Sequence, residues 1–389
     1  MRTIGVVTVG RSDYGLLRPI LKRIQADSEL KLSLFVGGMH LSPDFSMTVG
    51  MIKSDGFPIS ARVDTPAYTD TPAAIAKAMG AGGAGFAEVF ALMRPDLLLV
   101  LGDRFEMHAA ALAALPFKIP VAHVHGGEIT EGAFDDALRH SMTKLSHLHF
   151  ASAEPYAKRL IQMGEEPWRV MVSGAPALDN IGTMGLLTPE ELQHQFGIAT
   201  NPPPLLVTFH PVTLEYERTE WQTGQLLNAI RVSGIPPVFT LPNADTSNRI
   251  IIRLLKEFIE KNSSAKLIEN FGTQAYFSMM AASAAMVGNS SSGIIEAASF
   301  KLPVVNVGTR QKGRLRAANV IDVGYETEEI VRGIRTALDP EFRAGLQNLE
   351  NPYGNGDASE RIVDRLKSIP IDGRLIKKVF YDLPKPLDE

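Results

Sequence analysis

The stretch DLLLVLGDRFEMHAAALAALPFKIPVAHVHGG, residues 96–127, shows the plan that the rest of the chain repeats. Its apolar runs DLLLVLG (96–102) and PVAHVH (120–125) predict buried β-strands, and the segment that separates them has the amphipathic pattern of a helix. Strands that alternate with helices in this way are typical of a parallel sheet covered by helices. The sequence therefore predicts an α/β fold.

The same alternation continues along the chain in two series of predicted strands. The remaining strands of the first series are 3–9, 31–38, 147–152 and 169–174, and the second series is 205–210, 237–242, 265–270, 285–289 and 303–308. A chain of 389 residues also exceeds the length that one hydrophobic core usually organises. Together these features predict two doubly wound, Rossmann-like domains.

The expected domain boundary lies after residue 175. A polar, mixed segment, 175–197, follows there and leads into ATNPPP, whose consecutive prolines can continue neither a helix nor a central strand. We therefore expect a first domain over residues 1–175 and a second over 176–365.

Composition excludes several classes of protein. There is no cysteine, so disulfides, thiolate metal sites and a cysteine nucleophile are ruled out. The net charge is −4 without a run of Lys or Arg, which argues against a nucleic-acid surface. The N-terminus lacks the apolar core of a leader, and no segment approaches 18 uninterrupted apolar residues, so we expect a cytoplasmic protein without a membrane partner.

Polar side chains follow the predicted strands at their carboxyl ends. In sheets of this type ligands bind beyond those ends, where the strand order reverses. The polar residues that follow a predicted strand or open the next element are Arg11, His40, Asp103, His125, His210, Asn243, Ser290 and Arg310.

The segment GNSSSGIIEAASF (288–300) has the pattern of an anion site. Three serines stand between a predicted strand and a helix, where hydroxyls and free backbone N–H groups converge. A serine that only caps the helix is the alternative, although a cap needs one serine rather than three. Glu296, one to two turns into the expected helix, could reach a ribose hydroxyl.

Two further strand ends carry charge. GTRQKGRLR (308–316) supplies Arg310, Arg314 and Arg316, whose guanidinium groups suit phosphate, although a solvated basic loop fits equally well. Asp103 and Arg104 follow a very apolar strand, and there a carboxylate is either a helix cap or a catalytic group.

A glycine-rich segment imitates a dinucleotide-binding motif. GAGGAGF (80–86) places Gly80, Gly82 and Gly85 in the G-x-G-x-x-G pattern, but the residues before it read as helix rather than strand. We therefore expect a flexible or closely packed helix and no nicotinamide cofactor.

The densest group of titratable residues is HVHGGEITEGAFDDALRH (123–140). His123 and His125 alternate along a predicted strand, so they should point to opposite faces and not chelate one metal. Asp136 and Arg139 lie at i, i+3 of a predicted helix, on one face. This arrangement favours proton transfer over metal binding, and an acidic first helical turn is the structural alternative.

Taken together, these motifs resemble the hydrolysing UDP-N-acetylglucosamine 2-epimerase family, which includes the epimerase half of the bifunctional epimerase/kinase of sialic acid synthesis. The matching elements span nearly the whole chain: GRSDYG (10–15), GMHLS (38–42), GDRFE (102–106), GGEITEGAFDDALRHSMTKLSH (126–147), FHPVT (209–213), LPN (241–243), GNSSSGIIE (288–296) and GTRQKGR (308–314). The resemblance implies a GT-B-like fold with two Rossmann-like domains facing a central cleft, the first completed by residues 366–389. It also implies a homodimer or larger homo-oligomer.

The resemblance assigns roles to the candidate residues. Diphosphate, ribose and nucleotide contacts would come from Ser290, Ser291, Glu296, Arg310, His210 and Asn243, with Arg11 and Arg104 closing on the nucleotide. The sugar would be surrounded by His40, Asp103, Asp135, Asp136 and Arg139. The chain departs from the family at His125, where many members have a glutamate, so either His125 or Glu128 would take that acid/base role.

The expected reaction is hydrolysis of UDP-N-acetylglucosamine, with inversion at C2, to UDP and N-acetylmannosamine. The alternatives are the same chemistry on a nucleotide-linked 2,4-diacetamido-2,4,6-trideoxyhexose, a GT-B glycosyltransferase that needs an acceptor, and an inactive nucleotide-sugar sensor. None of these calls for a metal or a redox cofactor.

Overall fold

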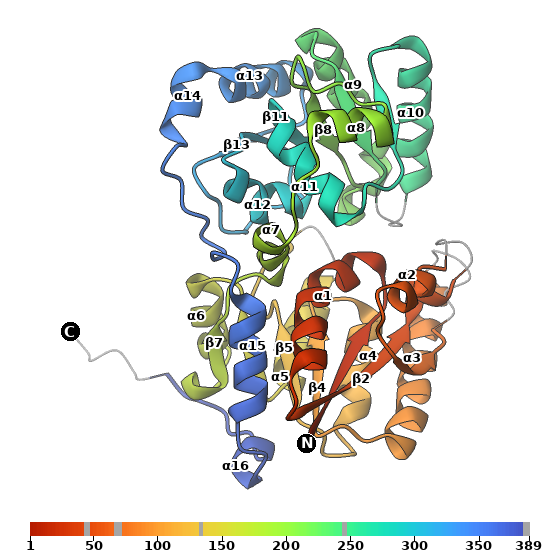
Figure 1. Cartoon of the computed structure of the whole chain (residues 1–389), viewed down its shortest axis with the longest axis vertical. Coiled ribbons are helices and arrows are strands. Elements are labelled where there is room, and N and C mark those ends of the chain that lie inside the picture. Colours follow the sequence, from red (N-terminus) through yellow and green to blue (C-terminus); the bar gives the residue numbers. More distant parts are fainter. Residues whose placement is uncertain (43–46, 66–71, 132–134, 243–246, 384–389) are drawn as a thin grey trace, which may run out of the picture. The chain divides into compact units, whose positions relative to one another are not determined.

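Two parallel β-sheets, each with its own helices, form the computed structural model of the chain (Figure 1). It describes residues 1–42, 47–65, 72–131, 135–242 and 247–383. The first compact unit comprises Met1–Glu128, Asp135–Asp179 and Tyr353–Glu389, and the second comprises Ile129–Phe134 and Asn180–Pro352.

The first unit contains a seven-stranded sheet in the order β3-β2-β1-β4-β5-β6-β7, and all its strand pairs are parallel. Its strand order runs outward in opposite directions from β1 and β4, as in a doubly wound fold. Its elements are β1 (Arg2–Thr8), α1 (Arg11–Ala26), β2 (Leu30–Gly37), η1 (Gly38–Leu41), α2 (Val49–Ser54), β3 (Ile59–Val63), α3 (Pro72–Leu92), β4 (Leu97–Leu101), α4 (Phe105–Ala114), β5 (Val121–Val124), α5 (Asp135–Leu145), β6 (Leu148–Ala151), α6 (Glu154–Gln162), η3 (Pro167–Arg169), β7 (Val170–Val172), η4 (Pro176–Leu178), α15 (Ala358–Ser368) and α16 (Gly373–Ile376).

The second unit contains a six-stranded parallel sheet in the order β10-β9-β8-β11-β12-β13, which is the strand order of a Rossmann domain. Its elements are α7 (Asp179–Thr183), which begins at the end of the first unit, α8 (Pro189–Phe196), β8 (Leu205–Thr208), η5 (Thr213–Arg218), α9 (Thr219–Ser233), β9 (Pro237–Thr240), α10 (Asn248–Lys261), β10 (Lys266–Ile268), α11 (Gly272–Ala282), β11 (Ala285–Gly288), α12 (Ser291–Ile295), η6 (Ala297–Phe300), β12 (Val304–Val307), β13 (Val320–Val323), α13 (Thr327–Leu338) and α14 (Pro340–Gly345).

The predicted strands all form, but two edge strands are additional. β3 (ISARV) and β13 (VIDV) are mostly only half-buried and contain charged residues, so their sequences lack the continuous apolar run of a central strand. By contrast, all five residues of β4 are buried. Each such aliphatic side chain stabilises the fold by roughly 1.5–3 kcal/mol relative to an exposed one.

The glycine-rich segment lies within helix α3, as expected. Gly82 and Gly85 pack so closely that added Cβ atoms would lie 3.0 Å from Thr65 Cγ2 and 2.8 Å from Val63 Cγ1. Residues 73–92 of this helix are long and apolar enough to cross a membrane by length and composition alone, a test that core helices also pass. Phe86 and Phe90 of α3 are buried in the core of the first unit.

The chain returns to the first unit at Tyr353. Helix α15 lies beside α1 (Figure 1). The segment that follows α15 is held by Arg169. The fully buried guanidinium of Arg169 donates to the backbone oxygens of Arg374, Leu375 and Lys377 at 2.8, 2.9 and 3.3 Å. A side chain from the middle of the sequence thus fixes the returning segment.

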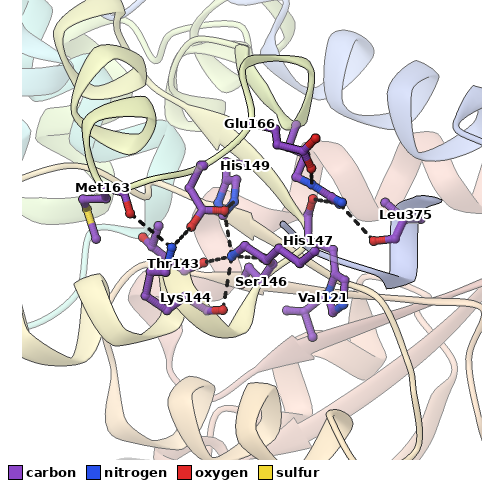
Figure 2. A network of polar contacts seen from close by, with 12 residues as sticks. Val121, Thr143, Lys144, Ser146, His147, His149, Met163, Glu166 and Leu375 are labelled. Atoms are coloured by element: carbon purple, nitrogen blue, oxygen red, sulfur yellow. Dashed lines mark hydrogen bonds and ion pairs between the residues drawn. The ribbon is translucent and has the colours of Figure 1, made fainter. Parts of the chain in front are cut away.

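Figure 2 shows the neighbouring polar network, in which Lys144 and His149 are labelled. Both of them contact Glu165, which is a buried carboxylate. It accepts from His149 at 2.8 Å, from Lys144 at 2.7 Å and from Lys378 at 2.6 Å. Lys378 also donates to three backbone oxygens at the end of α5, so it ties the returning segment to that helix. Burial opposes the charge on Glu165, but these donors outweigh it and lower the pKa of Glu165 to about 2.

Glu165→Gln should destabilise the first unit at pH 7 by on the order of 3 kcal/mol, because the pKa of Glu165 lies below its usual value only in the folded state. The stabilisation that ionised Glu165 gives the folded state is present above pH 4.5 and is lost as the pH falls towards 2. The difference in the free energy of unfolding between Glu165→Gln and the parent protein should therefore narrow over that range. Urea unfolding followed by Trp168 fluorescence in a Trp221→Phe background measures it.

Glu360→Gln is the matched control, because Glu360 pairs with Arg23 at an exposed position. We expect it to change the free energy of unfolding by less than about 1 kcal/mol. Equal effects of the two substitutions would contradict a stabilising role for the buried network.

Candidate active site

Several of the predicted site residues follow the strands at which the strand order of each sheet reverses. In the first sheet this point lies at the carboxyl ends of β1 and β4, and in the second at those of β8 and β11. Arg11 begins α1 after β1, and Asp103 and Arg104 follow β4. His210 follows β8 and Ser290 follows β11.

Arg139 is the centre of the site in the first unit. It lies on α5 with 2% of its surface exposed, and it forms ion pairs with Asp103 and, at 3.4 Å, with Glu128. Burial opposes the positive charge, but the two carboxylates more than compensate and raise the pKa of Arg139. Asp103 therefore acts as the partner of a buried cation rather than as a helix cap, and α4 has Arg104 at its N-cap without a side-chain capping bond.

His125 and Glu128 form a second buried pair. The Nδ1 atom of His125 lies 2.5 Å from Glu128 Oε1, and both side chains are almost fully buried. Strand β5 ends at Val124 and His125 has a φ of 64°, so the expectation that His125 continues the strand is wrong.

His123 is engaged separately from His125. Its Nε2 atom lies 2.7 Å from the backbone oxygen of Gly102, and burial lowers its pKa to about 3. The described residues contain no group of three His, Asp or Glu side chains placed to hold a metal ion.

Helix α5 opens with Asp135 and Asp136, both half-buried. Asp136 pairs with His140 at 3.4 Å, whereas the ion pairs of Arg139 are with Asp103 and Glu128. Arg139 therefore pairs with two carboxylates to which its helical spacing did not point, and the charge of Asp136 also contributes to the raised pKa of Arg139.

His40 is a neutral, doubly hydrogen-bonded side chain. Its ring nitrogens lie 2.9 Å from Thr8 Oγ1 and 2.7 Å from Thr48 Oγ1, and burial together with the charge of Arg104 lowers its pKa to about 4.

Asp13 and Glu106 are buried carboxyls that the sequence analysis missed. Asp13 pairs with Arg104 at 3.3 Å, and burial raises the pKa of both carboxyls. Their positions in GRSDYG and GDRFE, directly after β1 and β4, are the sequence signal that could have identified them.

Asn289, also missed, joins the loops of the second unit. It is fully buried, accepts the His210 N–H at 2.7 Å and donates to the His210 backbone oxygen at 2.8 Å. Its own backbone oxygen accepts from Arg310 at 3.1 Å and from Gln311 at 2.9 Å. Asn289 therefore fixes the residues that follow β8, β11 and β12 relative to one another. Burial, with the charge of Arg310, lowers the pKa of His210 well below its usual value.

The serine segment begins a helix that is shorter than expected. Helix α12 ends at Ile295 and Glu296 is its C-cap, with a separate 3-10 turn beyond. Ser290 caps the helix through a 3.4 Å bond from the Ser292 N–H, which supports the capping alternative for this serine. Its hydroxyl also lies 2.8 Å from the Ser292 hydroxyl, which lies 2.7 Å from Tyr276. Ser291 is half-buried at the first helical position.

The three arginines after β12 differ in their surroundings. Arg310 is half-buried against Asn289, whereas Arg316 pairs with Asp322 at 2.7 Å and donates to the backbone of Arg314. Arg316 thus has a carboxylate partner on the adjacent strand β13 and a backbone partner within its own loop. Asn243 lies outside the described residues.

Comparison with known proteins identifies the family of the chain and the type of fold. The family model described as UDP-N-acetylglucosamine 2-epimerase matches residues 22–367. A protein of Legionella pneumophila named UDP-N,N'-diacetylbacillosamine 2-epimerase (hydrolyzing) is 39% identical over 97% of this chain and 99% of its own length. One of Campylobacter jejuni named GDP/UDP-N,N'-diacetylbacillosamine 2-epimerase (hydrolyzing) is 38% identical over 98% and 99%.

A solved structure supports the fold. The UDP-GlcNAc 2-epimerase of Neisseria meningitidis bound to UDP-GlcNAc superposes with a TM-score of 0.81 over 94% of this chain and 99% of that one, at 22% identity. The predicted GT-B-like α/β fold of two Rossmann-like domains is confirmed.

Asn289→Ala should destabilise the second unit by about 2–4 kcal/mol, because it removes both hydrogen bonds that the Asn289 side chain makes with the buried N–H and C=O of His210. Urea unfolding followed by Trp221 fluorescence in a Trp168→Phe background reports on this unit. Asn228→Ala, at an exposed position of α9, is the control and should change stability by about 0.5 kcal/mol or less. A similar result for both variants would show that Asn289 does not organise the loops.

Proposed function

Since the chain belongs to the UDP-N-acetylglucosamine 2-epimerase family, we propose that this hydrolysing 2-epimerase acts on UDP-linked 2,4-diacetamido-2,4,6-trideoxyhexose, the diacetylbacillosamine type of sugar. The products are UDP and the free sugar inverted at C2. Such a product is suited to extension towards a nonulosonic acid.

The observation that carries the chemistry is the group of Arg139, Glu128 and His125, which are buried, and Asp103, which is half-buried, at the carboxyl ends of β4 and β5. It combines carboxylates, a fixed cation and an imidazole in one place, largely shielded from water. Such an environment strengthens electrostatic stabilisation of a transition state and suits general acid–base catalysis.

The reaction needs these groups because C2–H of the sugar is not adjacent to a carbonyl. A base can remove the C2 proton only as the bond from C1 to the diphosphate oxygen breaks, so that a C1=C2 double bond forms and UDP departs. Water then adds across this double bond, so that a hydroxyl group is attached at C1 and a proton at C2. This proton arrives on the face of the sugar opposite to the one from which the first proton was removed, and C2 is thereby inverted. Carboxylates stabilise the positive charge that develops at C1, and cations carry the leaving group.

The roles divide between the two switch points. In the second unit, diphosphate and nucleoside contacts are assigned to Ser290, Ser291, Glu296, Arg310, His210 and Asn243. In the first, Arg11 and Arg104 serve the nucleotide, and the sugar is assigned to His40, Asp103, His125, Glu128, Asp135, Asp136 and Arg139.

The choice of sugar rests on the two relatives whose names specify diacetylbacillosamine, at 39% and 38% identity. UDP-N-acetylglucosamine is the second candidate, because the family as a whole is described by that substrate. The two sugars differ at C4 and C6. The diacetamido sugar has an acetamido group on C4 and its C6 is a methyl group, whereas N-acetylglucosamine has a hydroxyl group on each of these carbons.

Incubation of the enzyme with each UDP-sugar in deuterated water tests both the reaction and the substrate. We expect faster release of UDP from the diacetamido sugar, and one deuterium at C2 of the free product, detected by proton NMR. Retention of the original C2 hydrogen would sink the elimination mechanism. UDP release only after an acceptor is added would indicate a glycosyltransferase instead.

Two substitutions test the division of roles. Asp103→Asn should lower kcat by about 100-fold or more, with the Kd for UDP changed by less than about threefold, because it removes charge from the reacting side. Arg310→Ala should instead weaken UDP binding by roughly tenfold, because it removes a cation from the diphosphate side. Titration calorimetry with UDP and initial-rate assays separate the two effects, and the reverse pattern would refute these assignments.

A further inference from the structure

The two ring nitrogens of His125 have different surroundings. Nδ1 lies 2.5 Å from a carboxylate oxygen of Glu128. Nε2 is buried and has no hydrogen-bond partner among the described residues. A ring nitrogen that makes no hydrogen bond within the protein is free to accept one from a ligand.

The left-handed backbone conformation at His125 is a further mark of function. Its φ of 64° is uncommon for a residue other than glycine, and its N–H is held by the Phe150 backbone oxygen at 3.0 Å. Strained conformations of this kind persist where the surroundings fix them, and they cluster at active sites.

Ser152 takes part in the same arrangement. It follows β6, is 1% exposed, and its hydroxyl donates to Glu128 Oε1 at 2.6 Å, the oxygen that also faces His125. Arg139 approaches the other oxygen, Oε2, at 3.4 Å. Donors from β6 and α5 therefore hold Glu128 from two sides and favour its negative form.

An ionised carboxylate can only accept a hydrogen bond, so the proton of a neutral His125 ring must lie on Nδ1. The lone pair of the ring then lies on Nε2. A carboxylate that orients a histidine in this way fixes its tautomer and stabilises the imidazolium that forms when the ring takes up a proton.

We propose that Ser152 and Glu128 are positioning residues that fix the Nδ1–H tautomer of His125, so that Nε2 is the base that removes the C2 proton of the sugar. This inference rests on the proposed function. In the first step Nε2 takes the proton, the electrons of the C2–H bond form the C1=C2 double bond, and the C1–O electrons leave with UDP. The imidazolium is balanced by Glu128.

The charged groups near the pair come from several elements, and they include Arg159 of α6, which donates to the backbone oxygen of Gly127. Glu128 and Arg139 lie within the arrangement, and Asp103 reaches it through Arg139. His123, the neighbouring histidine of β5, is neutral because burial lowers its pKa to about 3. Glu128 is therefore the carboxylate in direct contact with the His125 ring, and Ser152 and Arg139 are donors to it.

The tautomer can be measured without any substrate. In a sample labelled with ¹⁵N at histidine, long-range ¹H–¹⁵N spectra distinguish a protonated nitrogen from a bare one, and His125→Gln identifies the His125 signals. We expect Nδ1 protonated and Nε2 bare in the parent protein, and a mixture of tautomers in Glu128→Gln. An Nε2–H tautomer in the parent would overturn the proposal, whatever the sugar specificity proves to be.

The pH profile of kcat/KM gives a second test, with whichever UDP-sugar the enzyme turns over. Removing the charge in Glu128→Gln should lower kcat by about 100-fold or more and move the acid limb to lower pH, because the imidazolium loses its counter-charge. Ser152→Ala should move the acid limb in the opposite direction, because Glu128 loses a competing donor and interacts more strongly with His125. Ser152→Thr, which restores the hydroxyl, should return the profile towards that of the parent.

A purely structural role predicts a different outcome. Glu128→Gln and Ser152→Ala would then lower the melting temperature while leaving the acid limb where it is, and this result would refute the proposal. If Glu128→Gln does not fold, Ser152→Ala and the tautomer of the parent protein still decide the question.

Discussion

The buried charge of Arg139 is the constraint on which the first site depends. A guanidinium with 2% exposure is stable only where carboxylates replace its lost hydration, and here these come from Asp103 after β4 and Glu128 after β5. The interaction therefore joins three segments of chain at the carboxyl edge of the sheet. It also determines where Glu128 lies, and through Glu128 the orientation of His125.

In the second unit, a neutral side chain holds the loops at the carboxyl ends of the strands together. Asn289 offers an amide donor and acceptor to the backbone of His210, while its own backbone oxygen receives Arg310 and Gln311. Asn289 carries no charge, so the loops are held at this point without adding a negative charge beside Arg310. A neutral anchor is compatible with an anionic ligand, whereas the buried ion pairs of the first unit suit proton transfer.

The sequence was sufficient for the fold because central parallel strands must be apolar on both faces. The sequence did not predict strands β3 and β13, because positions at the edge of a sheet tolerate charged residues. It also did not predict the ion-pair partners of Arg139, because helical spacing pointed to Asp136. The actual partners lie 36 and 11 residues away and become neighbours only when β4, β5 and α5 are packed together. Strand-end position identified Asp103, His210 and Arg310, but the central role of Asn289 could not be recognised before the backbone of His210 was known to face it.

The return of the chain to the first unit affects the order in which the protein is completed during synthesis. Apart from Ile129–Phe134, the second unit is contiguous, and it is complete once Pro352 has left the ribosome. The first unit begins earlier but lacks α15, Lys378 and the segment held by Arg169 until these have been translated after the second unit. The unit that is begun first is therefore finished after the other, and α5, which carries Arg139, acquires its contacts with Lys378 only once the second unit has been made.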